Sequence, residues 1–392
     1  MTTNWPAVWV IYAAGLAAGA YMTKVAPALP PLRAELGLTL VESSFIATTF
    51  NIIGMAAGVL AGMLCDRYGQ KRLGIAGLLI MAAGGILGLL SHDFSLLLLS
   101  RFAEGLGFIL FAVAAPALMS AAAATARDRA KALGLWSSYM PTGGALMLFA
   151  APLLVTAWGW RGIWGAAAAA ASVCAFLIWR SVPAPQHGAI RSWHLIAESF
   201  AQRGNLVMAA LFACYVAQWT SVMIWLPTFL IDEHRLATGT AALATALMVL
   251  VNAPGNLAGG WLIAHGAKRR TVIVAACAIA ALCEVGMLTP ALPGGVRFAL
   301  VLVFSLCAGA IPACIFAGLP VHAKTPQHIA TGNGIVMHGS NLGQFLGPLA
   351  LAWIASHLGG WQATLWPMLG FAVTGMLLGI ILGRIERNKI SA

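Results

Sequence analysis

Long apolar segments recur along the whole chain and constrain its fold more than any other feature. Clusters of glycine, proline and charged residues divide the 392 residues into twelve apolar runs. A helix needs about 20 apolar residues to cross the hydrocarbon core of a bilayer, and the runs have about that length. The chain holds only 22 Lys and Arg and 11 Asp and Glu, too few to cover the surface of a water-soluble protein of this size. The sequence therefore predicts a polytopic membrane protein.

The twelve runs are predicted to be transmembrane helices. A segment inside lipid must satisfy its own backbone hydrogen bonds, and no run alternates as a barrel strand does. The expected fold is all-α, with an N-terminal six-helix bundle over 1–180, a cytoplasmic linker over 181–204 and a pseudo-symmetric C-terminal bundle over 205–392. The expected helices are 7–29, 42–64, 73–91, 95–120, 132–157, 160–180, 205–231, 240–263, 271–289, 297–321, 330–356 and 362–383.

The cationic residues predict the orientation of the chain in the membrane. Sixteen of the 22 Lys and Arg fall in loops or termini on one side of the predicted bundle. The positive-inside rule assigns that side, with both termini, to the cytoplasm. The net charge of +11 is then a topology signal, and no nucleic-acid partner is expected. The first run follows no basic region typical of a cleaved signal peptide. We expect a monomer in the lipid bilayer of a bacterial inner membrane, spanning it many times.

The two halves of the sequence repeat each other. Arg-Phe-Ala begins the fourth run at 101–103 and the tenth run at 297–299, which is 196 positions later. Gly143 in the fifth run recurs as Gly343 in the eleventh, 200 positions later. Duplicated halves around a central cavity at the membrane midplane are the usual architecture of a secondary transporter.

The loop after the second run carries the most specific motif, G-x-L-x-D-R-x-G-x-K-R over residues 62–72. Its acid follows a helix among several cations, where it can pair with them or cap a helix N-terminus. A charge cluster made in one conformation and broken in another would bias alternating access. A static loop that only fixes topology is the alternative. The expected gating residues are Gly62, Asp66, Arg67, Gly69, Lys71 and Arg72.

Over its whole length the chain resembles the major facilitator superfamily. The motif at 62–72 is similar to the family's signature in the loop between helices 2 and 3, and Arg101-x-x-x-Gly105-x-Gly107 is similar to a second signature. The helix exits at 29–32 and 225–230 resemble those of cyanate permease-like carriers. The resemblance implies a transporter rather than an enzyme, with helices 1, 4, 7 and 10 around the cavity.

Ionisable side chains inside a membrane are costly and are functional candidates by default. Lys24, one turn after Tyr21, would attract an anionic substrate, unless it extends to the membrane interface. Arg101 and Glu104 are three residues apart and can pair; Arg101 could steer an anion and Glu104 could exchange a proton, or the pair could be purely structural. Glu284, the lone acid of the ninth run, is interpreted as structural or interfacial.

Polar side chains on one face of the eleventh run form a second group of candidates. His338, Asn341 and Gln344 fall within an arc of roughly 140° together with Asn333, and histidine titrates in the range that proton coupling needs. A histidine that is simply satisfied in the core is the alternative. The expected proton-coupling residues are Glu104 and His338. The expected substrate-binding residues are Lys24, Tyr21, Arg101, Gln218, Trp219, Asn252, His338, Asn341 and Gln344.

The sequence predicts no cofactor and no metal. It contains neither a GK[ST] phosphate loop nor an HExxH pair, so an ion or solute gradient must supply the energy. We expect uptake of a small anionic organic solute, coupled to protons. Efflux of drugs or metabolites is the alternative, but the G-x8-G-x3-G-P pattern that antiporters of the superfamily show in helix 5 is found here in the eleventh run, from Gly334 to Pro348.

Overall fold

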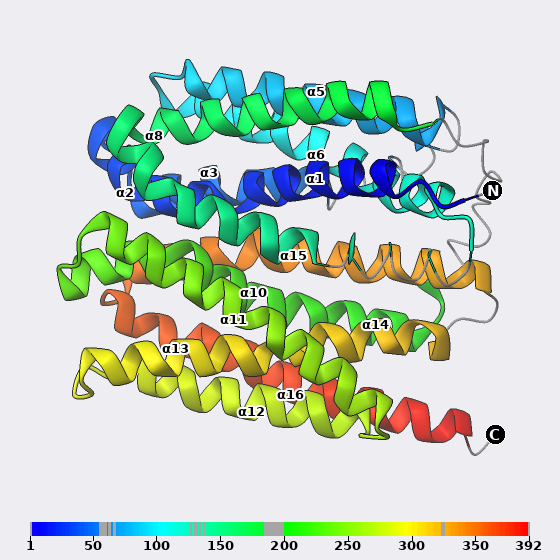
Figure 1. Cartoon of the computed structure of the whole chain (residues 1–392). Coiled ribbons are helices and arrows are strands. Elements are labelled where there is room, and N and C mark those ends of the chain that lie inside the picture. The colour runs from blue at the N-terminus through cyan, green and yellow to red at the C-terminus, as the bar shows by residue number, and fades with distance from the viewer. Residues whose placement is uncertain are drawn as a thin grey trace. The chain divides into compact units, whose positions relative to one another are not determined.

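The computed structural model describes residues 2–54, 61, 64–65, 68–125, 128, 132, 135–136, 138–183, 200–322 and 326–390. The elements formed by these residues are helices (Figure 1). Those of the N-terminal half are α1 (Trp5–Thr23), α2 (Val25–Leu36), α3 (Leu40–Thr48), η1 (Thr49–Asn51), α5 (Gln70–Leu89), α6 (Phe94–Ala122) and α8 (Tyr139–Ser181). Those of the C-terminal half are α10 (Arg203–His234), α11 (Thr238–Ala264), α12 (Arg269–Leu288), α13 (Gly294–Ala308), α14 (Ala310–His322), α15 (Pro326–His357), η2 (Trp361–Thr364) and α16 (Leu365–Ile390).

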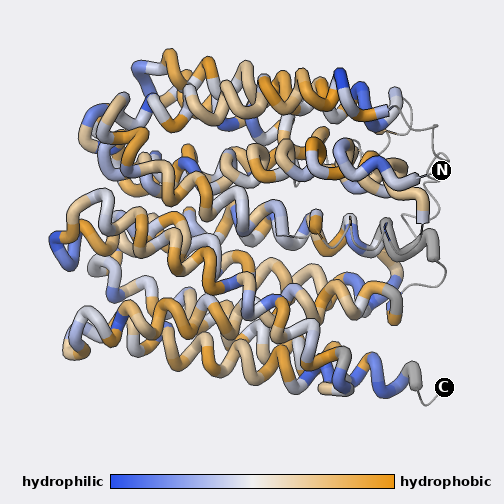
Figure 2. Tube along the Cα trace, viewed as in Figure 1, coloured by the Kyte–Doolittle hydropathy of each residue, from blue (hydrophilic) through white to orange (hydrophobic). Residues whose placement is uncertain are grey.

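Most of these helices are long and apolar enough to cross a bilayer. Nine segments of the described residues meet that criterion, and Leu40–Gly54 is a shorter apolar helix. The 43-residue segment Tyr139–Ser181 contains two spans, because the backbone turns at Trp158 and at Gly159, where φ is +63°. Because Tyr139–Ser181 counts twice, the nine segments contain ten of the twelve expected spans. The shorter helix Leu40–Gly54 corresponds to the second expected span, and α15 corresponds to the eleventh. Figure 2 shows hydrophobic residues along the helices and hydrophilic ones gathered towards their ends.

Prolines interrupt two of the expected helices. The first run continues from α1 into α2 with a break at Lys24, and Pro27 lacks the amide hydrogen that would bond to the carbonyl of Thr23. The tenth run is divided at Gly309 into α13 and α14. There, Pro312 lacks the amide that would bond to the carbonyl of Ala308.

The chain separates into two compact units. The first unit comprises residues 1–191 with 236–246, and the second comprises 192–235 with 247–392. The start of α11 therefore groups with the first unit. The predicted linker, 181–204, lies largely outside the described residues, because the structure describes none of residues 184–199. Its boundaries therefore stay a prediction.

Equivalent helices pack together in the two units. In the first unit the main packed pairs are α1 with α8, α5 with α6 and α5 with α8. In the second unit they are α10 with α15, α12 with α13 and α12 with α16. These are the same pairs of spans, counted from the start of each half. The internal repeat seen in the sequence thus extends to the packing inside each unit.

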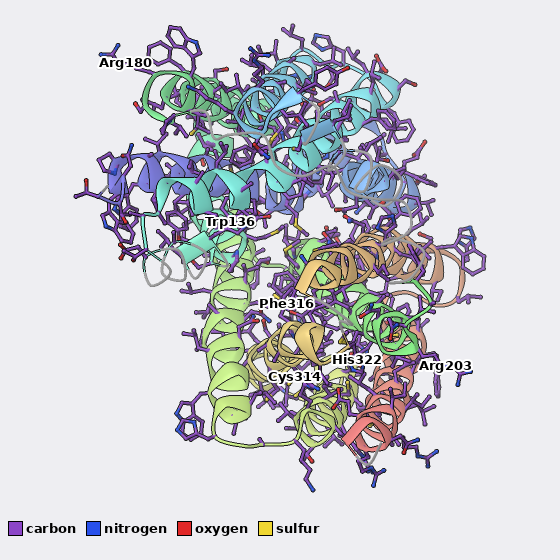
Figure 3. All side chains as sticks on the ribbon, turned by 90° about the vertical axis from the view of Figure 1, so that its right-hand side faces the viewer. Trp136, Arg180, Arg203, Cys314, Phe316 and His322 are labelled. Atoms are coloured by element: carbon purple, nitrogen blue, oxygen red, sulfur yellow. The ribbon has the colours of Figure 1, made fainter. Side chains whose placement is uncertain are left out.

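Most residues in the hydrophobic core cluster of the second unit belong to α10, α12 and α14, and α13, α15 and α16 contribute one each. Figure 3, viewed along the helices, labels Cys314, Phe316 and His322, all of which belong to α14. Cys314 is fully buried, and the ring of Phe316 lies 5.8 Å from that of Phe212. His322 Nε2 lies 3.3 Å from Glu386 Oε1, which ties α14 to α16.

Candidate functional site

Lys24 lies inside the first unit, at the break between α1 and α2. Its side chain is 0% exposed, and its Nζ donates a hydrogen bond to Glu104 Oε1 at 2.6 Å. The alternative in which the lysine extends to the membrane interface is therefore wrong. Lys24 keeps helical backbone dihedrals at this break, with φ −57° and ψ −26°, and its ammonium group faces α6.

Arg101 and Glu104 lie one turn apart on α6, and both are fully buried. The Nη1 atom of Arg101 donates to Glu104 Oε2, so the pairing predicted from their spacing is confirmed. Arg101 Nε also donates to the carbonyl of Ile46 at 3.0 Å, and Nη1 donates to the carbonyl of Tyr21 at 3.3 Å. Glu104 thus bridges two cations from different spans. We call Lys24, Arg101 and Glu104 the charge cluster.

Two aromatic rings enclose the ammonium group of Lys24. Its Nζ lies 4.2 Å from the centroid of the Tyr21 ring and 4.5 Å from that of Trp164, within the range of cation–π attraction. The hydroxyl of Tyr21 donates to the carbonyl of Met81 at 3.0 Å. Sequence reasoning included Tyr21 but missed Trp164, because no local pattern connects a tryptophan with a lysine 140 positions earlier.

Glycines on α5 make room for the side chains of this site. A Cβ added at Gly84 would lie 2.8 Å from Glu104 Cγ, and one added at Gly88 would lie 2.1 Å from the Trp164 ring. Any larger residue at these positions would displace the cluster or its aromatic wall. The close approach of α5 and α6 is therefore part of how the acid is positioned.

The charge cluster holds two cations and one carboxylate. Arg101 Nη2 is buried and has no hydrogen-bond partner among the described residues. A buried charge that lacks a counter-charge is costly in a membrane protein. Two events would change this balance: a second anion would pair with the excess positive charge, and a proton on Glu104 would loosen its hold on both cations.

In the second unit, Trp219 of α10 and Asn252 of α11 meet at Ser305 of α13. Trp219 Nε1 donates to Ser305 Oγ at 3.0 Å, and Asn252 Nδ2 donates to the Ser305 carbonyl at 2.9 Å. The Ser305 hydroxyl in turn donates to the carbonyl of Met248 at 2.7 Å. Sequence reasoning missed Ser305, since a single serine in an apolar run carries no pattern.

The other predicted polar residues of the second unit do not join this group. Gln218 Nε2 donates to the carbonyl of Met368 on α16 at 3.1 Å. His338, Asn341 and Gln344 each form a hydrogen bond with a residue four positions earlier in α15. Gln344 Oε1 is buried without a partner among the described residues. Their proposed roles in binding and proton coupling stay predictions.

The gating motif is described only in part. Gly62, Asp66 and Arg67 lie outside the described residues. Gly69 precedes α5 with φ +90°, a conformation that favours glycine. Lys71 Nζ donates to the carbonyl of Trp179 at 2.9 Å, near the end of α8, and Arg72 is exposed. No group of three or more His, Cys, Asp and Glu suited to a metal occurs in the described part of the chain.

Several proteins of known or proposed function are similar in sequence. The putative niacin/nicotinamide transporter NiaP of Bacillus subtilis is 24% identical over 345 residues, which covers 83% of this chain and 82% of that protein. A probable 4-methylmuconolactone transporter of Cupriavidus pinatubonensis is 27% identical and matches 56% of this chain and 54% of its own. Multidrug resistance protein Stp of Mycobacterium tuberculosis is 31% identical over 35% of this chain, but only 25% of Stp is matched.

Solved transporter structures share the fold. A bacterial homolog of the human lysosomal transporter Spinster, inward-facing and unoccupied, superimposes with a TM-score of 0.81 at 17% identity over 98% of this chain and 96% of its own. The D-xylose–proton symporter does so with a TM-score of 0.75 at 15% identity over 97% of each chain. The expected twelve-helix fold is thereby confirmed. The model of the Major Facilitator Superfamily matches residues 10–333, and the chain therefore belongs to this family of membrane transporters.

Proposed function

We propose that this transporter takes up a small anionic organic solute together with protons, and that the charge cluster is its binding and coupling site. One observation carries the proposal: a fully buried group of charges contains two cations and a single carboxylate. A carboxylate on the substrate would supply the missing negative charge, and Lys24 and Arg101 would hold it.

The same three residues suggest how a proton is coupled to the solute. While Glu104 is ionised, its carboxylate forms ion pairs with both Lys24 and Arg101. Protonation neutralises Glu104 and breaks both ion pairs. The two cations are then free to pair with the incoming anion. Release of the anion on the other side of the membrane restores the ionised acid and its two ion pairs. Proton and anion are then bound together and released together.

The placement of cations and the relatives support the remaining parts of the proposal. Loops rich in Lys and Arg favour an inner-membrane protein with cytoplasmic termini. The relatives named for niacin/nicotinamide and for 4-methylmuconolactone support a small organic substrate. The protein is proposed to act as a monomer, since both units belong to one chain.

Efflux is the second candidate, and some relatives favour it. Stp and the methylenomycin A resistance protein of Bacillus subtilis are named for drug resistance. In the fifth span, which is the first part of α8, Met147 and Leu148 stand where the antiporter pattern has Gly-Pro. The complete pattern lies in α15 and ends at Gly347 and Pro348, which weakens the efflux hypothesis.

The proposal is tested with purified protein in two steps. A thermal-shift screen against small carboxylates and cationic drugs identifies a ligand, since a compound that binds only the folded state stabilises it. Uptake of that ligand is then measured in proteoliposomes with an inward proton gradient, with and without a protonophore. We expect a carboxylate as ligand and gradient-dependent accumulation.

Lys24→Met separates a binding role from a structural one. This variant keeps the Arg101–Glu104 pair, so it should fold, but it should lose binding and uptake of the carboxylate. Arg161→Gln is the matched control, because Arg161 pairs with Glu35 elsewhere in the first unit and is partly exposed. Wild-type uptake by Lys24→Met would overturn the proposal, and stabilisation by cationic drugs alone would favour efflux.

A further inference from the structure

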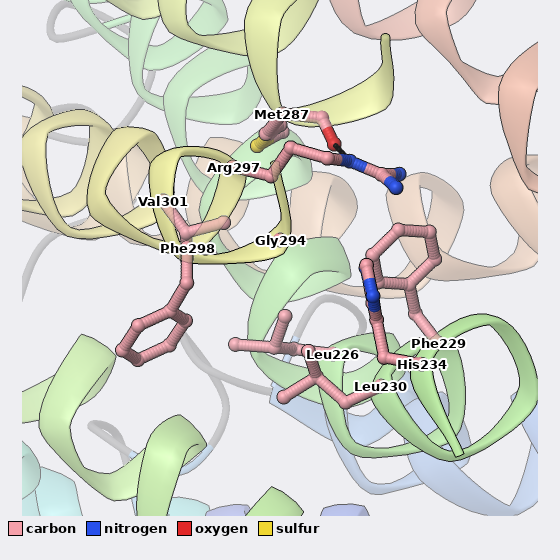
Figure 4. A pocket seen from close by; sticks show the side chains of 9 residues that line it. All are labelled: Leu226, Phe229, Leu230, His234, Met287, Gly294, Arg297, Phe298 and Val301. Carbon is pink, nitrogen blue, oxygen red and sulfur yellow. Dashed lines mark hydrogen bonds between the residues drawn. The ribbon is translucent and has the colours of Figure 1, made fainter. Parts of the chain in front are cut away.

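A pocket in the second unit lies where three helix ends meet, and it shares no residue with the charge cluster of the first unit. It is a small, partly open hollow, and the figure of about 220 Å³ of space between its walls includes open solvent. Its walls come from the end of α10, the end of α12 and the start of α13, as Figure 4 shows. The polar side chains that line it are those of Arg297 and His234.

Arg297 is a buried cation without a carboxylate partner. It is 6% exposed, and its Nε donates to the carbonyl of Met287 at 2.8 Å. Its Cζ lies 5.2 Å from the centroid of the Phe229 ring. Its Nη2 is buried with no hydrogen-bond partner, and no acid of the described residues lies within ion-pair distance. The nearby acids Asp232 and Glu233 are exposed instead.

The start of α13 adds further hydrogen-bond donors to the same pocket. The residue at the N-cap is Pro293, and no side chain caps the first turn. Gly294 lines the pocket, and a Cβ added there would lie 3.4 Å from the His234 ring. Free amides and the helix dipole make an uncapped N-terminus attractive to anions. It lies beside a buried guanidinium that has no carboxylate partner among the described residues, so two independent features favour the same charge.

The internal repeat shows what this site lacks. Arg297 occupies the position of Arg101, 196 residues later, but the equivalent of Glu104 is Leu300. Arg101 therefore receives an internal carboxylate three residues further along its helix, and Arg297 does not. Leu300 packs against α12, where a Cβ added at Gly286 would lie 2.3 Å from its Cδ1.

We propose that this pocket binds a phosphate group, held by Arg297, the ring of His234 and the first amides of α13. A free phosphate and the headgroup of a phospholipid present the same oxyanion. The guanidinium would donate to the oxygens, and the glycines at the start of α13 let the anion approach the backbone closely. The site is separate from the charge cluster and does not depend on the proposed substrate.

The experiment measures how phosphate stabilises the full-length protein in detergent. Inorganic phosphate is titrated at constant ionic strength against chloride, and the unfolding midpoint is followed. Arg297→Gln removes the cation, whereas Leu300→Glu keeps it and supplies an internal carboxylate. Both variants should weaken the apparent phosphate affinity by about tenfold or more. Arg235→Gln, which removes an exposed cation outside the pocket, should leave the affinity within about twofold.

A second arm distinguishes the two sources of the phosphate group. Native mass spectrometry compares retention of phosphatidylglycerol with that of a glucosyl diacylglycerol, which has no phosphate. Selective retention of phosphatidylglycerol that is lost in Arg297→Gln and Leu300→Glu supports a lipid headgroup, and a response to inorganic phosphate supports a free anion. If neither ligand discriminates the wild type from these variants, the proposal is wrong. Lys24→Met should respond like the wild type, which separates this result from a failure of the proposed uptake function.

Discussion

The three charges of the cluster are not equivalent, because one carboxylate serves two cations. Glu104→Gln would leave Lys24 and Arg101 buried without a counter-charge, whereas Lys24→Met leaves the Arg101–Glu104 pair intact. Removing one partner from a buried ion pair typically costs about 3–5 kcal/mol. We expect Glu104→Gln to lower the unfolding midpoint in detergent far more than Lys24→Met does. Equal losses in the two variants would contradict this account of the charges.

Glu284 of α12 is buried in a different way. It is 0% exposed, and neither of its carboxylate oxygens has a hydrogen-bond partner among the described residues. The sequence interpretation of this acid as structural or interfacial stays a prediction. A neutral side chain of similar shape should fit at least as well, since an unpaired carboxylate is costly to bury.

We therefore expect Glu284→Gln to keep the stability of the wild type within about 1 kcal/mol, and Glu284→Leu to be neutral or stabilising. Thermal unfolding of the purified variants measures both effects. Uptake should persist, because Glu284 is not part of the charge cluster. A large loss of stability in Glu284→Gln would show that the ionised acid has a partner.

Spacing along one helix was enough to predict some contacts of the site, and three-dimensional packing decided the others. The Arg101–Glu104 pair follows from its i, i+3 spacing. The bond from Lys24 to Glu104 joins residues 80 positions apart, and no local pattern encodes it. On α15, His338 and Asn341 bond to backbone carbonyls of their own helix. Periodicity places them on one face but cannot show whether their polar groups are already occupied.

At the scale of helices, the sequence predicted where apolar runs lie better than how each one is interrupted. Runs near 20 residues gave the spans, and prolines mark the breaks. The consequence of a break depends on tertiary structure, however. Pro116 leaves α6 continuous, while the helix divides at Gly309, ahead of Pro312. The sequence did not predict that Lys24 lies at such a break, and only the structure showed it.

Close backbone contacts between helices depend on glycine at equivalent positions of both units. A Cβ at Gly143 of α8 would lie 2.1 Å from the carbonyl oxygen of Leu16, and one at Gly343 of α15 would lie 2.3 Å from that of Ala213. Backbone atoms cannot turn aside as side chains do, so the helices would have to separate. Overpacking of this kind costs about 1–3 kcal/mol.

We expect Gly143→Ala and Gly343→Ala each to destabilise the protein by that amount in thermal or denaturant unfolding. Gly370→Ala is the matched control, because it also lies in a membrane helix but no described atom lies within 4 Å of its added Cβ. It should be neutral or slightly stabilising, since alanine favours helix over glycine. An equal loss in all three variants would contradict this account, because Gly370→Ala creates no close contact and gains helix propensity.

At the scale of the molecule, the two units share their packing but not their charges. The loop cations follow the repeat: Lys71 bonds to the carbonyl of Trp179 on α8, and Arg269, 198 positions later, pairs with Glu386 on α16 at 2.7 Å. The charge cluster has no second copy, because Leu300 replaces the acid. Repetition therefore made the fold predictable, whereas both proposed sites lie where the copies differ.

Orientation in the membrane follows from the whole set of cations and can be tested directly. Lys and Arg concentrated at one end of the helices should keep that end, with the C-terminus, in the cytoplasm. Alkaline phosphatase is active only outside the cytoplasm, whereas green fluorescent protein exported in unfolded form does not fluoresce. A C-terminal fusion should therefore be fluorescent and lack phosphatase activity. A fusion after Ala291, between α12 and α13, should show the opposite, because that short loop lies at the far end of α12. Phosphatase activity of the C-terminal fusion, or fluorescence of the fusion after Ala291, would contradict this orientation.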